Sequence, residues 1–229
     1  MSQHLITIAT QAVAFLLGWL SARPLIRRLR AELADAAWWL GHDPLTGMLN
    51  RVGFYAAHTA LALTPQPVVI LLIDLDDFKP VNDTHGHDTG DDLLIEIGDR
   101  ISEVADMFGG TAARLSGDEF AVLLPVREHG HARTADLFLD AIAQPVQLAT
   151  DDATVTVTVT ASIGVSIAES SDPLDDVALR RADVAMYHAK HAGGNRYTVY
   201  EPGMTMPTSE HRRGPRLRDL RQQHRGVTA

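Results

Sequence analysis

Apolar residues follow three different patterns along the chain, and each pattern predicts a different kind of element. Residues 67–73 form a continuous apolar run that ends in acidic residues, which is typical of a strand buried on both faces. Residues 91–108 carry apolar side chains at a helical period, so they predict a long amphipathic helix. Residues 154–168 alternate strictly, which predicts one strand, or two strands joined at residues 161–162.

The other segments complete an alternation of strands and helices. Residues 113–124 predict a strand, a turn and a second strand, and residues 131–143 look helical. Residues 173–193 form an amphipathic helix that ends at a pair of glycines, and residues 195–200 make a last strand. Strands that alternate with helices predict an α/β (α+β) domain with helices packed around one mixed sheet, over residues 41–202.

An uncharged segment lies near the N-terminus, at residues 5–22, and four arginines follow between residues 23 and 30. Its length is near the lower limit for crossing a bilayer, and the arginines place the rest of the chain in the cytoplasm. We therefore predict a transmembrane anchor over residues 1–22, in the inner (cytoplasmic) membrane, with the folded domain in the cytoplasm. The alternative is an apolar helix that pairs with a copy of itself in a cytoplasmic protein.

Two further segments flank the domain. Residues 23–40 predict a helical stalk, with Pro24 in its first turn and a leucine stripe that could pair two chains. Residues 203–229 are rich in proline and arginine and have too few apolar residues to order themselves. We expect a disordered basic tail there.

The composition of the chain argues against several classes of function. The formal net charge of the 229-residue chain is −9, which argues against nucleic acid as a partner, because phosphate backbones need a basic surface. It does not argue against a nucleotide that is held through a metal. The chain has no cysteine, so disulfides, thiolate chemistry and cysteine-ligated zinc are excluded.

Acidic residues gather at the ends of two predicted strands. Asp74, Asp76 and Asp77 close the first buried strand, and Asp118 and Glu119 open another. If these strands are neighbours, several carboxylates meet at one edge of the sheet and repel one another. A divalent cation relieves that repulsion, and Mg²⁺ accepts both carboxylate ligands and substrate phosphates. The alternative is that these acids lie on turns that face solvent.

The segment after the first strand supplies further candidates. Lys79 is close enough to Asp74 in sequence to neutralise phosphate charge. The amide of Asn82 both donates and accepts, so it can bind the edge of a base. Asp91 lies in the first turn of the predicted long helix, where an acid is also explained by the helix dipole. His87 is more often a surface or capping histidine than a ligand.

Five segments resemble, in their order and spacing, the GGDEF domains of bacterial diguanylate cyclases, over about residues 41–201. The segments are Asp43–Arg51, Asp74–Leu94, Arg114–Phe120, Ala161–Ser166 and Ala182–Arg196. The resemblance implies a sheet like that of nucleotide cyclases and polymerase palms. It also implies a homodimer in which two Mg²⁺–GTP complexes face each other and condense into cyclic di-GMP, with release of pyrophosphate, as second-messenger synthesis.

The resemblance also implies roles for individual residues. The implied metal ligands, for two Mg²⁺ ions per site with Mn²⁺ as the alternative, are Asp74, the Leu75 carbonyl, Asp118 and Glu119. The implied catalytic groups are Asp118, Glu119 and Lys79, and the implied GTP contacts are Phe78, Asn82, His87, Asp91 and Lys190. Asn82 and Asp91 resemble the residues that bind guanine.

The chain departs from the family at three places. The signature reads SGDEF, and we expect its first position, Ser116, to need a positive φ that costs a non-glycine residue roughly 1–2 kcal/mol. Met107 and Gly110 replace the Arg-x-x-Asp of the product-inhibition site, so we expect no feedback there. Gly194 replaces an arginine that contacts triphosphate, for which Arg196 is the substitute. Ser116 and Gly194 keep open the alternative of a weak or inactive GTP-binding module that signals by dimerisation.

Overall fold

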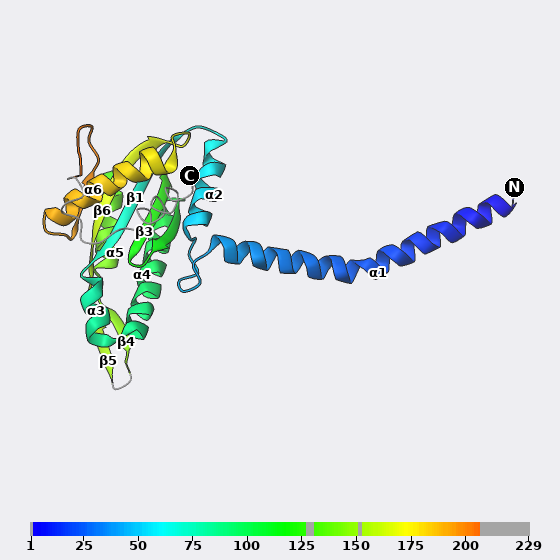
Figure 1. The fold of residues 1–229 in the computed structure, drawn as a ribbon, viewed down its shortest axis with the longest axis horizontal. Helices are drawn as coiled ribbons and strands as arrows, with labels where there is room; N and C mark the ends of the chain where they lie inside the picture. The colour runs from blue at the N-terminus through cyan, green and yellow to red at the C-terminus, as the bar shows by residue number, and fades with distance from the viewer. Residues whose placement is uncertain (1, 127–130, 151–152, 207–229) are drawn as a thin grey trace, which may run out of the picture.

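In the computed structural model, a long N-terminal helix extends away from an α/β domain (Figure 1). The structure describes residues 2–126, 131–150 and 153–206. Its helices are α1 (Ser2–Gly41), α2 (Arg51–Ala62), α3 (Phe78–His85), α4 (His87–Met107), α5 (His131–Ile142), the π-helical turn η1 (Leu174–Leu179) and α6 (Arg180–His191). Its strands are β1 (Pro67–Asp76), β2 (Thr111–Ser116), β3 (Glu119–Pro125), β4 (Val146–Ala149), β5 (Thr154–Val157), β6 (Thr160–Glu169) and β7 (Arg196–Val199).

The main sheet has five strands in the order β2-β3-β1-β6-β7. The continuous apolar strand β1 lies at its centre and runs antiparallel to both β3 and β6. β7 joins the far edge parallel to β6, so the sheet is mixed, as predicted. β4 and β5 form a separate two-stranded sheet at the end of the domain near α3 (Figure 1).

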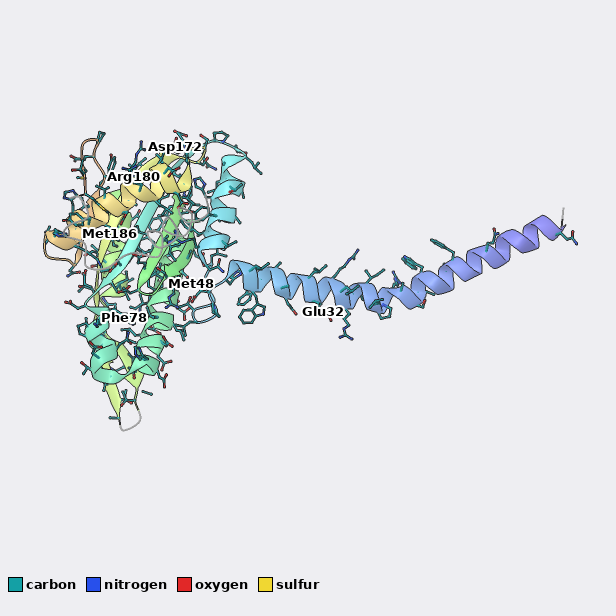
Figure 2. The ribbon with its side chains drawn as sticks, viewed as in Figure 1. Glu32, Met48, Phe78, Asp172, Arg180 and Met186 are labelled. Carbon is teal, nitrogen blue, oxygen red and sulfur yellow. The ribbon has the colours of Figure 1, made fainter. Side chains whose placement is uncertain are left out.

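Helices cover both faces of the sheet, because alternate residues of β1 point to opposite faces. One face carries Val69, Leu71 and Ile73, which pack in one apolar cluster with residues of α4 and α5. The other face carries Val68 and Ile70, which pack with residues of α2 and α6. This confirms the predicted mixed sheet with helices packed around it. Figure 2 labels Met186 of α6, which belongs to this second cluster, and Phe78 lower in the same view, where α3 begins.

Several predicted boundaries differ from the structure, and α4 begins at His87 rather than at residue 91. The alternating segment divides at residues 158–159 rather than 161–162, because β5 pairs with β4 whereas β6 pairs with β1, and the chain must pass from one sheet to the other. The last helix begins with the π-helical turn η1 before α6 continues to His191. The strand–turn–strand, the helix over residues 131–142 and the last strand lie where they were predicted.

The N-terminal segment forms one continuous helix, α1, over the residues predicted as an anchor and a stalk. Pro24 lies inside this helix and not in a first turn. Proline lacks the N–H of a helical hydrogen bond and is a common cause of bending, and Figure 1 shows that α1 bends along its length. Glu32 lies on the part of α1 that stands clear of the domain (Figure 2).

The membrane prediction is not supported. Within the part of the chain that the structure describes, no helix is long and apolar enough to cross a membrane. The apolar first part of α1 instead continues into a second part that carries the exposed arginines. Some side chains of the predicted anchor lie outside the described residues, as does the predicted basic tail from residue 207 on. The predicted location of the protein stays a prediction.

Candidate active site

Backbone pairing brings the two groups of acidic residues together. Asp74 near the end of β1 lies directly opposite Glu119 at the start of β3. The backbone N–H of Leu75 donates to the carbonyl oxygen of Asp118 at 3.2 Å. Residues directly opposite each other on antiparallel strands point to the same face, so the side chains of Asp74 and Glu119 share one face of the sheet.

Asp74 is the most buried of these acids, with 7% of its surface exposed. Burial raises its pKa to about 6, because water no longer stabilises the charged form. Lys190 opposes this shift, whereas the charges of Asp118 and Glu119 add to it. The carboxylates of Asp118 and Glu119 are therefore close enough to disfavour the charged form of Asp74.

Lys190 supplies a positive charge at this point of the sheet. It lies in the last turn of α6, and its ammonium group forms an ion pair with the carboxylate of Asp74. The helix comes this close because Gly164 of β6 has no side chain. A methyl group there would overlap the backbone of Ala182 and Met186 in α6. Gly164 thus allows α6 to bring Lys190 to Asp74.

The carboxylates at these strand ends are ligands of the kind that divalent metals prefer. Asp74, Asp118 and Glu119 provide hard oxygen ligands next to the Leu75 carbonyl, and their mutual repulsion favours a cation. Among the described residues, no group of three or more histidine, aspartate or glutamate side chains is arranged as a ready-made metal site. The positively charged group that contacts Asp74 in the structure is the ammonium of Lys190.

The signature turn contradicts one expectation. The positive φ of the turn falls on Gly117, at 51°, and the described non-glycine residues with positive φ are Asp77 and Asn195. Ser116 is the last residue of β2 and pairs with Glu119. The predicted strain at Ser116 is therefore wrong, because this hairpin places its left-handed residue one position later. The Ser116 hydroxyl instead donates to Oε2 of Glu119 at 3.2 Å.

The predicted guanine-binding residues lie where α3 meets α4. The side-chain oxygen of Asn82 lies against Gly90, where any side chain would overlap it. Asp91 is the next residue of α4 and is exposed. It belongs to the second turn of the helix, because α4 begins at His87, directly after Gly86 with its φ of 89°. The acid of the first turn is Asp88.

The other predicted contacts surround this junction. Phe78 begins α3 and is buried, so the structure leaves its backbone as the part that can meet a ligand. Lys79, which follows it, and His87, which begins α4, are exposed. The structure thus brings together Asp74, Asp118, Glu119 and Lys190, and it places the candidate base contacts on the α3–α4 segment that leads from β1.

Asp76 is a further residue of this region, to which the sequence analysis assigned no separate role. Its carboxylate accepts hydrogen bonds from the hydroxyls of Thr160 and Ser162, at 2.8 and 2.7 Å, and from the backbone N–H of Asn195 at 2.9 Å. It thereby holds the turn that follows α6. Period-two alternation along β1 is the signal that places Asp76 on the same face as Asp74.

The same turn explains Gly194. Its φ is +70°, and a methyl group there would lie 2.8 Å from Oδ2 of Asp76. An arginine at this position would be strained and would crowd that carboxylate. Arg196, the predicted substitute, donates from Nε to the carbonyl oxygen of Gly194 at 3.0 Å.

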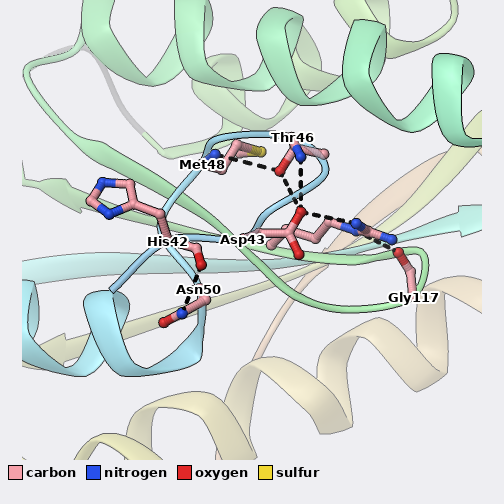
Figure 3. A network of polar contacts seen from close by, with 7 residues as sticks. His42, Asp43, Thr46, Met48, Asn50 and Gly117 are labelled. Atoms are coloured by element: carbon pink, nitrogen blue, oxygen red, sulfur yellow. Dashed lines mark hydrogen bonds and ion pairs between the residues drawn. The ribbon is translucent and has the colours of Figure 1, made fainter. Parts of the chain in front are cut away.

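A second polar network joins the end of α1 to the signature turn (Figure 3). Asp43 accepts hydrogen bonds from the backbone N–H and hydroxyl of Thr46, at 3.0 and 2.8 Å, and from Nη1 of Arg114 at 2.9 Å. Burial alone would raise the pKa of Asp43, but these hydrogen bonds outweigh it and hold the pKa below its usual value. Nε of Arg114 also donates to the carbonyl oxygen of Gly117 at 2.8 Å.

Asn50 fastens α1 to α2 in the same network. Its amide nitrogen donates to the carbonyl oxygens of Leu40 and His42, at 3.0 and 2.9 Å. Its amide oxygen caps α2 by accepting from the N–H of Gly53 at 3.0 Å. Asn50 and the Asp43–Arg114 pair lie within the segments that resemble the family, but spacing alone gave no reason to assign them a role.

Met107 and Gly110 are the residues that we expect at the place of the family's product-inhibition site. Met107 ends α4 and is exposed. Gly110 lies between α4 and β2, where a side chain would overlap Leu124. An aspartate at Gly110 would therefore need the core beneath it to move.

Comparison with known proteins identifies the family. The family model described as "Diguanylate cyclase, GGDEF domain" matches residues 40–196. The chain therefore belongs to the GGDEF family, as its sequence motifs predicted. The chain is similar to MucR of Pseudomonas aeruginosa, a bifunctional diguanylate cyclase/cyclic di-GMP phosphodiesterase, with 35% identity over 95% of this chain and 32% of MucR. It is 34% identical to the diguanylate cyclase DgcM of Escherichia coli K12, over 74% of this chain and 40% of DgcM.

Solved structures agree with this assignment. The coiled coil and GGDEF domain of DgcB from Caulobacter crescentus, in complex with c-di-GMP, match with a TM-score of 0.70 and 26% identity, over 78% of this chain and 95% of that one. The GGDEF domain of TpbB (YfiN) from Pseudomonas aeruginosa matches with a TM-score of 0.59 and 34% identity, over 70% and 94%. The chain spans about a third or less of the length of the first curated relatives it matches.

Proposed function

We propose that this chain is a diguanylate cyclase that condenses two molecules of GTP into cyclic di-GMP and releases two of pyrophosphate. The main support is that Asp74, Asp118 and Glu119 lie close together at the ends of neighbouring strands, where Lys190 forms an ion pair with Asp74. Family membership supports it, because several curated relatives are named diguanylate cyclases. Phosphoryl transfer of this kind depends on position and charge neutralisation more than on covalent chemistry.

The acidic residues hold the metal and prepare the attacking group. Asp74, Asp118, Glu119 and the Leu75 carbonyl would bind Mg²⁺ or Mn²⁺, two ions per site. Such a metal would neutralise charge on the phosphates. A carboxylate oxygen of Asp118 accepts the proton of the 3′-hydroxyl as the 3′-oxygen attacks the α-phosphorus. The bond from that phosphorus to the bridging oxygen then breaks, and pyrophosphate leaves.

The remaining residues bind the substrate. Lys79 and Lys190 balance the charge of the triphosphate, and the backbone at Phe78 donates to phosphate oxygens. Asn82 and Asp91 bind guanine, since a carboxylate accepts from its N1 and N2 hydrogens. The packing of Asn82 against Gly90 supports this assignment, because it fixes the amide next to Asp91. His87, exposed at the start of α4, lies next to this base site.

The reaction needs two chains, because each site supplies one of the two nucleotides that react. α1 offers a surface for this pairing: its exposed apolar side chains include Phe15, Leu16, Trp19, Leu20, Leu25, Ile26, Leu29 and Leu33. Pairing of two α1 helices would cover these side chains. The similar DgcB structure contains a coiled coil as well as a GGDEF domain. We therefore propose a homodimer, with no nucleic-acid partner.

We expect no product inhibition at the position of the family's Arg-x-x-Asp site. Met107 supplies no guanidinium, and the packing of Gly110 on Leu124 leaves no space for a carboxylate. Cyclic di-GMP added to the assay should therefore leave the initial rate unchanged, apart from competition at the GTP site.

A product assay tests the proposal. Protein, Mg²⁺ and GTP are incubated, and cyclic di-GMP is quantified by chromatography, with Asp118→Asn as the matched inactive variant. We expect product from the native chain and a loss of at least a hundredfold in Asp118→Asn. GTP binding without pyrophosphate release, in both the native chain and Ser116→Gly, would favour the alternative of a non-catalytic GTP-binding module. Glycine in place of the family's arginine at residue 194 supports that alternative.

A further inference from the structure

Lys190 has a position that its expected role as a triphosphate contact does not explain. Its ammonium group forms an ion pair with Asp74, the most buried acid of the site. The chain has two lysines, Lys79 and Lys190. Both are candidates for binding the triphosphate. Among the described residues, Lys190 forms an ion pair with an acid of the site, whereas Lys79 is exposed and forms no ion pair.

The surrounding fold holds this ion pair in place. Gly164 lets α6 approach the sheet, because a side chain there would overlap the helix backbone. Asp76 binds the N–H of Asn195 and so fixes the turn that follows Lys190. Contacts of the residues before and after Lys190 in the chain therefore hold it next to Asp74. The ion pair is thus part of the packed structure.

Electrostatics explains why Asp74 binds a cation. The carboxylate is buried and lies close to the charges of Asp118 and Glu119. Removing one partner of a buried ion pair leaves an uncompensated charge that is strongly destabilising. Lys190 keeps 38% of its side chain exposed, so its ammonium can turn from Asp74 toward solvent or another anion without disturbing the packing of α6.

We propose that Lys190 is an internal cation that competes with the divalent metal for Asp74 and transfers to the triphosphate when metal and nucleotide bind together. This inference rests on the proposed function of the same site. An ammonium group and a divalent ion on one carboxylate repel each other, so metal binding must displace Lys190. The triphosphate then offers the displaced ammonium a new anionic partner.

The exchange predicts cooperation between metal and nucleotide. Metal alone binds weakly, because it must displace Lys190 without giving it another partner. Metal binds more tightly in the presence of a triphosphate, because the lysine then exchanges one anion for another. By linkage, the metal strengthens nucleotide binding by the same factor. Removal of the ammonium should therefore strengthen the binding of metal alone and reduce this cooperation.

Binding of Mn²⁺ to the full chain without nucleotide is the direct test. Mn²⁺ affinity is measured by calorimetry for the native chain, Lys190→Met and the charge-conserving Lys190→Arg. Lys79→Met is the matched control, because it removes the same charge from an exposed lysine of the same site. We expect roughly tenfold tighter Mn²⁺ binding in Lys190→Met, equivalent to about 1.4 kcal/mol. Lys190→Arg and Lys79→Met should stay within about threefold of the native chain.

Thermal unfolding provides a second readout that does not depend on activity. In the presence of a chelator, Lys190→Met should unfold at a lower temperature than the native chain, because Asp74 loses its partner. Saturating Mn²⁺ should raise the unfolding temperature more in Lys190→Met than in the native chain. Lys190→Gln, which keeps a polar side chain, replaces Lys190→Met if that variant does not fold.

The outcomes separate the inference from the proposed function. Native or weaker Mn²⁺ affinity in Lys190→Met, or no measurable Mn²⁺ binding in that variant, would overturn the inference. Equal gains in Lys190→Met and Lys79→Met would also overturn it, because they would reflect net charge alone. If Lys190→Met binds Mn²⁺ more tightly but the native chain makes no cyclic di-GMP, the proposed function fails and the exchange at Asp74 stands.

Discussion

The side chain of Arg114 forms an ion pair with Asp43, with 2.9 Å between Nη1 and Oδ1. Both side chains are largely buried, at 11% and 19% exposed. The same guanidinium binds the carbonyl oxygen of Gly117 through Nε. Asp43 lies in the turn after α1, and Gly117 lies beside Asp118, so Arg114 connects the N-terminal helix to the signature turn (Figure 3).

Loss of this connection should destabilise the domain. Arg114→Met leaves the largely buried Asp43 without its ion pair, which costs about 3 kcal/mol of unfolding free energy. It also frees the Gly117 carbonyl, so cyclase activity should fall at least tenfold. Urea unfolding measures the first effect. Arg28→Met is the control, because the Arg28–Glu32 pair is exposed at 78% and 55% and should change stability by less than about 1 kcal/mol. Equal stability of the two variants would contradict the account.

The signature turn should tolerate glycine at its first position and reject alanine at its second. Ser116→Gly should change kcat by less than about threefold, because Ser116 does not need a positive φ and its hydroxyl makes one long bond to Glu119. Gly117→Ala should cost roughly 1–2 kcal/mol, because its φ of +51° is left-handed while no atom lies near the added methyl. A large gain of activity in Ser116→Gly would show that Ser116 is strained after all.

Restoring the family's arginine at residue 194 should harm the protein. Gly194 and Gly47 share a φ of +70°, but only at Gly194 would a methyl meet Asp76. Gly47→Ala therefore measures the backbone strain alone, roughly 1–2 kcal/mol. Gly194→Ala should cost more by about 1 kcal/mol, and Gly194→Arg should not lower the KM for GTP. Equal losses at the two glycines would remove the explanation based on Asp76.

Asp74 should make stability depend on pH in the absence of metal. Its pKa is about 6 in the folded chain against an ordinary 3.8, so the folded state binds a proton more tightly between these values. The free energy of unfolding should therefore fall as pH rises from 4 toward 6 and level off above, by roughly 2–3 kcal/mol in total. Urea unfolding with a chelator measures this in the native chain and in Asp74→Asn. Parallel pH profiles of the two proteins would contradict it.

Much of the fold was predictable because many of its strands and helices follow a simple pattern of apolar residues, although α2, α3 and β4 were not predicted. The continuous run of β1 predicted a buried strand. The acids at the ends of β1 and β3 predicted a meeting only if these strands were neighbours, and the structure pairs them. The break between β5 and β6 was not predictable from alternation, since both strands alternate and only their pairing with different sheets separates them.

Other features depend on three-dimensional contacts that no local pattern encodes. Which residue of the signature turn is left-handed follows from the register of β2 and β3, which is irregular between Arg114 and Ser116. The ion pair of Lys190 with Asp74 depends on the approach of α6 at Gly164. Proline was expected to begin a helix, but Pro24 lies inside α1 because residues on both sides favour helix.

Two of these acidic sites together should convert GTP to cyclic di-GMP, and the ratio of the two products is the decisive measurement. Pyrophosphate and cyclic di-GMP are quantified in the same reaction across a range of chain concentrations. We predict two pyrophosphates for each cyclic di-GMP, and a rate per chain that rises with concentration until the chains are paired. GTP that binds at every concentration without release of pyrophosphate would contradict the account.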